Sequence, residues 1–214
     1  ILPQAMDGAS DNDVLNARFQ NGAQGWDTQT WQVSNIQRGV NMSPDWAGGG
    51  NDSFWQYMVG TPTVGAVIDT RSEFIVTQAG VTYETSVRAA QHRGAAQLFV
   101  QFYDANYNNL GAYFASGYGQ ESGSYHGALS TYNLLSLTAT APAGTAYRKI
   151  GLRLTATGGG EYPCAFFTQP TSRAVGGAAL NWNVAGEAVR IDDLSLVGYG
   201  VRPLGGATSG NDLI

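Results

Sequence analysis

Short runs of alternating apolar and polar residues recur along most of the chain. In the segment 97–103, Leu98, Val100 and Phe102 alternate with polar or aromatic residues. Side chains two residues apart lie on the same face of a β-strand. Gly, Asn, Thr and β-branched residues interrupt nearly every window long enough for an amphipathic helix. We therefore predict strands at 31–36, 53–59, 66–68, 73–77, 82–90, 97–103, 136–140, 149–155 and 188–197.

Three of these segments have one apolar and one polar face. Their apolar faces carry Tyr83, Thr85, Val87 and Ala89, then Leu98, Val100 and Phe102, then Ile150, Leu152 and Leu154. The opposite faces carry Arg88, Phe99, Gln101, Tyr103 and Arg153, with Glu84 at the edge. If the three strands are neighbours in one sheet, these side chains form one continuous polar and aromatic surface.

Turn residues separate the predicted strands at regular intervals, for example at 46–50, 104–106, 141–144 and 158–160. Eight or nine short strands spaced in this way predict an all-β fold, an antiparallel β-sandwich. In the last strand, Val189 and Ile191 differ in parity from Leu194 and Leu196. A β-bulge at Asp192 and Asp193 would keep all four inside, and it would re-aim two adjacent carboxylates.

Composition narrows the functional classes. Only 13% of the 214 residues are charged, 29 are Gly, 11% are aromatic, and the net charge is -5. This balance argues against coiled coils, charged disorder and a nucleic-acid surface. Cys164 is the single cysteine, which excludes an intrachain disulfide, and no apolar run has the length of a membrane span.

Both ends of the predicted sandwich resemble a known class. The segments 15–26, with its Gly25-Trp26 turn, and 189–196 resemble the first and last strands of galactose-binding-like β-jelly rolls, which include many carbohydrate-binding modules. The resemblance implies a jelly roll at 15–199, preceded by an extension at 1–14. Residues 200–214 are expected to be a linker or flexible tail.

The same resemblance implies a structural calcium ion between the first and last strands. Carried over to this chain, its ligands would be Asn16, Asn21, Asp192 and Asp193. Calcium prefers several carboxylate and carbonyl oxygens, and it would relieve the repulsion between the adjacent acids. The alternative is that Asp192 and Asp193 only cap or solvate the end of a strand. Gln20 stands where the family often has an acidic residue.

Sugar-binding proteins place aromatic rings against sugar faces and use polar side chains for the hydroxyls. Two surfaces of this chain fit that description. The first is the predicted sheet face with Arg88, Phe99, Gln101, Tyr103 and Arg153. The second is formed by loops and contains Trp46, Tyr107, Tyr118, Tyr125, His126 and Trp182.

Catalysis is the minority interpretation. Residues of the types used by alginate-type jelly-roll lyases are present, namely Arg88, Gln91, His92, Arg93 and Tyr147, but their local motifs do not match. Neither a carboxylate pair nor a nucleophile with an adjacent base is recognisable.

We therefore expect a noncatalytic module that binds a polysaccharide or cell-surface glycan and is extracellular, on the cell surface or on a virion. It could act as a homo-oligomer or attached to a larger protein. Two alternatives remain. One is a structural or receptor-binding subunit of an oligomeric virion spike or adhesin, and the other is a polysaccharide lyase or glycosidase.

Overall fold

The fold is an antiparallel β-sandwich, seen in a computed structural model that describes residues 12–14, 16, 17, 19, 24–27, 35–41, 53–121 and 132–175. The first sheet has the strand order β1-β4-β11-β7-β8, with β5 paired to β11. Its strands are β1 (Trp26–Asp27), β4 (Val67–Ser72), β5 (Ile75–Val76), β7 (Gly94–Tyr103), β8 (Asn109–Phe114) and β11 (Tyr147–Ala156).

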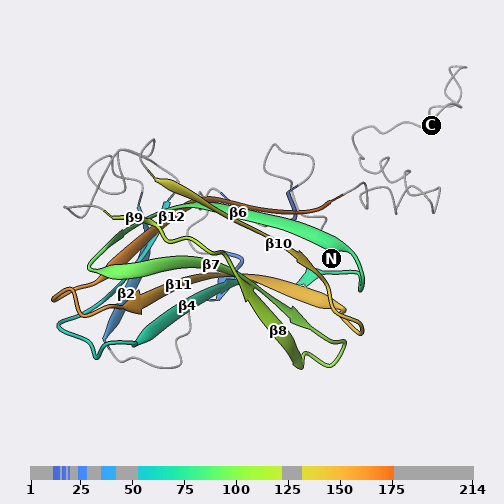
Figure 1. Cartoon of the computed structure of the whole chain (residues 1–214), viewed down its shortest axis with the longest axis horizontal. Helices are drawn as coiled ribbons and strands as arrows, with labels where there is room; N and C mark the ends of the chain where they lie inside the picture. Colours follow the sequence, from blue (N-terminus) through green and yellow to red (C-terminus); the bar gives the residue numbers. More distant parts are fainter. Residues whose placement is uncertain are drawn as a thin grey trace, which may run out of the picture. The chain divides into compact units, whose positions relative to one another are not determined.

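The second sheet has the order β10-β6-β12-β3-β2, and β9 pairs with β6 in parallel. Its strands are β2 (Ile36–Asn41), β3 (Ser53–Met58), β6 (Thr82–His92), β9 (Gln120–Glu121), β10 (Asn133–Thr140) and β12 (Cys164–Ala174). Figure 1 shows β6, β10 and β12 as a layer above β4, β7 and β11. The predicted all-β jelly-roll sandwich is confirmed. In the described ranges, no helix has the length and hydropathy to cross a membrane.

The predicted alternation places the core between the two sheets. Leu98, Val100 and Phe102 of β7 are fully buried, as are Ile150, Leu152 and Leu154 of β11. On the second sheet, Tyr83, Thr85, Val87 and Ala89 are buried in the same way. The odd-numbered residues of β7 and β11 therefore lie on the outer face of the first sheet.

Two of the longer strands, β12 and β8, were not predicted, and neither was the two-residue strand β9. β12 is a central strand of the second sheet, but Pro163 precedes it and Pro170 lies within it, and proline weakens the sequence pattern of a strand. Gln169 has φ 53°, which interrupts the alternation of β12. Before it the odd-numbered Phe167 faces the core, and after it the even-numbered Ser172 does so. β8 is an edge strand with mostly exposed side chains, so it lacks a buried apolar face.

Other predicted boundaries shift or lie outside the described residues. Most of the strand expected at 31–36 lies outside the described residues, and β2 begins at Ile36, directly after Asn35, which has φ 63°. The strand at 188–197 and its bulge are outside the described part of the chain, so they stay predictions. Asn12 to Val14, assigned to an N-terminal extension, lie against β12, where the Asp13 amide donates to the Ser172 carbonyl at 2.8 Å.

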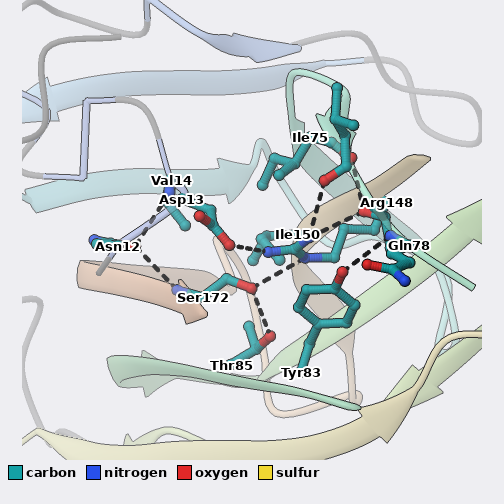
Figure 2. Close-up of polar contacts among 12 residues, drawn as sticks. Asn12, Asp13, Val14, Ile75, Gln78, Tyr83, Thr85, Arg148, Ile150 and Ser172 are labelled. Carbon is teal, nitrogen blue, oxygen red and sulfur yellow. Dashed lines mark hydrogen bonds and ion pairs between the residues drawn. The ribbon is translucent and has the colours of Figure 1, made fainter. Parts of the chain in front are cut away.

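A buried arginine joins this N-terminal segment to both sheets (Figure 2). Arg148 of β11 is fully buried, and its guanidinium donates to Asp13 Oδ2, to Thr77 Oγ1 at 2.9 Å and to Ser172 Oγ at 3.2 Å. Its Cζ lies 3.9 Å from the centre of the Tyr83 ring. These contacts connect β11 of the first sheet with β6 and β12 of the second.

Candidate functional site

The outer face of the first sheet gathers aromatic and charged side chains from several segments. It receives Asp69 and Arg71 from β4, Phe99, Gln101 and Tyr103 from β7, Phe114 from β8, and Tyr147, Lys149 and Arg153 from β11. Phe74, from the connection between β4 and β5, and Tyr107, from the turn between β7 and β8, extend it at one end. We call this set of residues the aromatic–polar face.

Four rings form a cluster at that end of the face: Phe74, Tyr103, Tyr107 and Tyr147. The Phe74 ring centre lies 5.0 Å from that of Tyr103 and 4.8 Å from that of Tyr107. Tyr107 and Tyr147 stack, with centres 5.1 Å apart and planes inclined by 14°. Phe74 is 40% exposed and Tyr107 is 56% exposed, so the cluster presents ring surface to solvent.

Strand register and one turn bring these rings together. Tyr147 of β11 is the direct cross-strand partner of Tyr103 of β7. The turn after β7 is closed by Asp104, whose Oδ1 accepts hydrogen bonds from the amides of Asn106 and Asn108, both at 2.8 Å. The Asn108 side chain bonds the same carboxylate, and these bonds lower the pKa of Asp104. Tyr107 has φ 65° within this turn, and its ring packs back against β11.

The other end of the face carries two arginines around one carboxylate. Asp69 accepts hydrogen bonds from Arg153 Nε at 2.7 Å, Arg153 Nη2 at 2.8 Å and Arg71 Nη2 at 2.9 Å. Both guanidinium groups lie over the ring of Phe99, at 5.4 Å for Arg71 and 5.2 Å for Arg153. Phe99 is 1% exposed although it points outward, because these groups and Phe114 cover it.

Lys149 and Gln101 connect the two ends. The Lys149 ammonium lies 4.2 Å from the centre of the Phe74 ring, and Gln101 Oε1 accepts a hydrogen bond from Arg71 Nε at 3.1 Å. Partial burial lowers the pKa of Lys149 and raises the pKa of Tyr103. A hydrogen bond with Tyr107 raises the pKa of Tyr147. These phenols are therefore neutral at physiological pH and suited to hydrogen bonding with neutral hydroxyl groups.

The structure brings together four of the five residues predicted for the sheet site. Phe99, Gln101, Tyr103 and Arg153 lie on the aromatic–polar face, since β7 and β11 are direct neighbours. The prediction of one continuous surface is wrong for Arg88, because β6 belongs to the second sheet. The Arg88 guanidinium donates to the Tyr132 carbonyl at 3.4 Å. Glu84, also on β6, pairs with Arg173 at 3.0 Å.

The predicted loop site is only partly described. Tyr107 belongs to the ring cluster, whereas Tyr118 is 50% exposed and its carbonyl accepts a hydrogen bond from Asn133 at the start of β10. Trp46, Tyr125, His126 and Trp182 lie outside the described residues.

The calcium prediction also rests mainly on residues outside the described part, namely Asn21, Asp192 and Asp193. Asn16 is buried, with φ 53°, and its side-chain amide donates to the Gln24 carbonyl at 3.0 Å. Its own carbonyl accepts from the Phe19 amide at 2.9 Å. In the described ranges, no group of three or more His, Cys, Asp and Glu side chains could hold a metal ion.

Sequence reasoning did not find Asp69, Arg71, Phe74 and Lys149 as site residues. A signal existed for Lys149, which shares its strand and parity with Arg153. Asp69 and Arg71 also alternate with buried residues, but the predicted strand at 66–68 ended before them. Phe74 was included in the strand predicted at 73–77, but β5 covers only Ile75–Val76, so Phe74 lies in the connection before it, where strand alternation does not set the direction of the side chain.

The residues considered for lyase chemistry are dispersed. His92 is at the end of β6, next to Gly94, which pairs with Ala156 at the far end of β11 from Tyr147. Tyr147 and Ala156 are nine positions apart along β11, a distance of about 30 Å. His92 Nδ1 lies 3.8 Å from Glu121 Oε1. Tyr147 therefore lies far from the proposed catalytic partner.

The sequence matches no protein-family model, and no curated protein is similar to it. Among solved structures, the enzymatically active domain of tailspike protein 4 from bacteriophage CBA120 matches with a TM-score of 0.54 and 15% identity. This match covers 77% of the present chain and 21% of the tailspike chain, so the present chain spans about a fifth of the length of that chain.

Two further structures illustrate the range of proteins with this fold. The CBM22-1–GH10 modules of a Clostridium thermocellum xylanase, complexed with xylohexaose, match with a TM-score of 0.50 and 12% identity, over 77% of this chain and 29% of that one. A cyclase from Fischerella sp. TAU matches with a TM-score of 0.50 and 13% identity, over 77% and 96%. Other matches include carbohydrate-binding modules of families 4, 16, 22 and 61. At these identities the likeness concerns the jelly-roll fold, which proteins of several functions share.

Proposed function

We propose that this protein is a noncatalytic module that binds a polysaccharide on the aromatic–polar face. The observation that carries the proposal is the ring cluster of Phe74, Tyr103, Tyr107 and Tyr147, which lies exposed beside a row of polar groups on one sheet. Exposed aromatic rings provide apolar area for the faces of sugar rings. The neighbouring amide, phenol and guanidinium groups supply hydrogen bonds to hydroxyls.

The polar groups of the face both donate and accept hydrogen bonds. Gln101 and the tyrosine phenols do both, Lys149 and the arginines donate, and Asp69 accepts. A sugar ring carries several hydroxyls that each need a donor or an acceptor when water is displaced. We accordingly place the protein outside the cell or on a virion, where such glycans occur.

A second candidate is a domain of a virion spike, either as a structural subunit or in receptor binding. The observation that favours it is the match to the phage tailspike domain, whose TM-score of 0.54 is above those of the two other matches described. This candidate is compatible with glycan binding, because a spike domain could hold a surface polysaccharide. A stable trimer in solution would support assembly, whereas a monomer at all concentrations would contradict it.

Substitution of Tyr147 by Ala tests the glycan site. The change removes one of the stacked rings, and we expect about tenfold weaker binding to whichever polysaccharide the wild type binds, as for a central aromatic contact. Binding is measured by affinity electrophoresis across neutral and acidic polysaccharides, followed by calorimetry on the best ligand.

Tyr162→Ala is the matched control. Tyr162 is 39% exposed and packs edge-on against Tyr57 of β3, in the second sheet, so its loss should leave binding unchanged. Melting temperatures verify that both variants fold. Equal affinity of the wild type and Tyr147→Ala would contradict the assigned face, and absence of binding to every glycan would contradict the function.

A further inference from the structure

Two guanidinium groups share one carboxylate at the β4–β11 pairing. Asp69 is 8% exposed, and its two oxygens are occupied by three N–H donors from Arg71 and Arg153. Each guanidinium has five N–H donors. Arg153 uses Nε and Nη2 for Asp69, and Arg71 uses Nε for Gln101 and Nη2 for Asp69. Among the described residues, none accepts a hydrogen bond from Nη1 of either arginine.

Aromatic packing holds both groups in place. The Arg153 guanidinium lies 5.2 Å from the centre of the Phe99 ring and 4.8 Å from that of Phe114, and the Arg71 guanidinium lies 5.4 Å from Phe99. The side chain of Arg153 remains 26% exposed and that of Arg71 remains 17% exposed. They are therefore accessible and already ordered, which lowers the entropic cost of binding a ligand.

The balance of charge differs between the two ends of the face. Asp27 and Glu73 are the other acids nearby, and both act electrostatically on Lys149 at the ring-cluster end. Asp27 is also the cross-strand partner of Arg71. Arg153 has Gln97 and Asp69 as its cross-strand partners, and it shares Asp69 with Arg71. Arg71 therefore has a second acid opposite it in the sheet, whereas Asp69 is the only acid paired with Arg153 among the described residues.

We propose that the polysaccharide bound on this face is acidic, and that Arg153, together with Arg71, binds a sugar carboxylate. The inference rests on the proposed function and adds the chemical class of the ligand. A carboxylate is planar, and guanidinium groups bind it through paired, charge-assisted hydrogen bonds. A uronate places this carboxylate beside hydroxyls, while the ring cluster receives neighbouring sugars of the same chain.

The test compares each acidic polymer with its own carboxyl-reduced form, so that only the charge differs. Polygalacturonate, alginate and hyaluronate serve as probes, and neutral galactan and xylan complete the panel. We expect the wild type to prefer one acidic polymer over its reduced form by about fivefold or more at low salt, the upper range for an accessible ion pair. Added salt should reduce this preference.

The variants Arg153→Gln and Arg153→Lys locate the effect. Arg153→Gln should lose the preference for the acidic polymer, whereas Arg153→Lys should keep part of it. Arg173→Gln is the matched control, since Arg173 is an exposed arginine of β12 in the other sheet that also pairs with one acid. It should bind as the wild type does, and melting curves verify that all variants are folded.

The outcomes separate this inference from the proposed function. Equal binding to acidic and reduced polymers, or binding to neutral glycans alone, overturns the acidic ligand and leaves the carbohydrate module intact. A preference that survives in Arg153→Gln overturns the role of Arg153. Failure to bind any member of the panel overturns both proposals.

Discussion

Arg148 carries a positive charge in the interior of the sandwich. Burial lowers its pKa, while the carboxylate of Asp13 and the hydrogen bonds of Thr77 and Ser172 favour the charged form. The Tyr83 ring adds a cation–π contact. Asp13 is the only acid paired with this cation among the described residues, and the protein should depend on it because an unpaired charge in the interior is strongly unfavourable.

We therefore expect Asp13→Ala to lower the free energy of unfolding by about 2 kcal/mol, less than for a fully buried pair because Asp13 is 43% exposed. Urea unfolding measures the difference. Glu84→Gln is the control, since its pair with Arg173 is exposed and should contribute less than about 1 kcal/mol. If both substitutions have the same small effect, Asp13 is not the essential partner of Arg148.

Individual site residues could be predicted where they alternate with core residues. Gln101 and Tyr103 were identified in this way because Leu98, Val100 and Phe102 indicate the core side of β7. Phe99 was also placed outward, but its burial beneath two arginines could not be predicted, since it depends on side chains from β4 and β11. Phe74 could not be predicted, because its contacts come from other segments.

At the scale of one strand, Gly151 makes room for the floor of the arginine site. A Cβ atom at this position would lie 2.0 Å from the Phe99 ring. Gly151 is the direct partner of Phe99 in the β7–β11 register and of Arg71 in the β4–β11 register. Phe99 therefore lies across the backbone of β11, where only glycine leaves the space.

Gly151→Ala should destabilise the protein by about 1–3 kcal/mol, because Phe99 must move from beneath both guanidinium groups. The same variant should also bind glycan with lower affinity under conditions in which it is fully folded. A loss of stability alone would not lower the affinity of the folded protein. Gly117→Ala is the control, because a Cβ there would make an ordinary contact at 3.5 Å with Leu135. Unchanged unfolding of Gly151→Ala would contradict this packing.

Strand prediction depended on how much each strand alternates. β6, β7 and β11 cross the sandwich with one buried face, and their alternation identified them. β12 instead buries side chains on both faces near Cys164 and Phe166, where a second apolar cluster with Ala90 and Tyr132 covers its outer side. A strand buried on both faces has no alternation, so its sequence is difficult to distinguish from other apolar segments.

This second cluster is expected to make the free energy of unfolding of the whole molecule decrease at alkaline pH. Burial raises the pKa of the Cys164 thiol to about 12, and burial also raises the pKa of Tyr132. The folded protein therefore retains protons that the unfolded chain loses from about pH 9 upward. Stability is complete below that pH and falls as the pH rises toward the folded-state pKa.

We expect the free energy of unfolding to fall between pH 7.5 and 10.5, by on the order of 1–2 kcal/mol for Cys164. Comparison of wild type with Cys164→Ala by urea unfolding isolates this contribution from other titrating groups. The variant should lose less stability over this range. An identical decrease in both proteins would show that the thiol does not contribute.

Sheet membership is a property of the whole molecule that alternation does not reveal. β6, β7 and β11 have the same pattern, yet β6 belongs to the second sheet, and the chain passes to β7 of the first sheet through a corner at Arg93, which has φ 59°. Because the patterns are the same, the sequence prediction put Arg88 of β6 on one face with Arg153 of β11. Local periodicity tells which side of a strand is buried, whereas the choice of neighbour depends on long-range packing.

Strand β11 serves the interior and the ligand surface with alternate residues. Arg148, Ile150, Leu152 and Leu154 face inward, and Tyr147, Lys149, Gly151 and Arg153 face outward. Apart from Gly151, which is constrained by Phe99, the outward positions can change without disturbing the interior. Related proteins could therefore acquire new ligand preferences through substitutions at every second position of one strand while the scaffold is inherited unchanged.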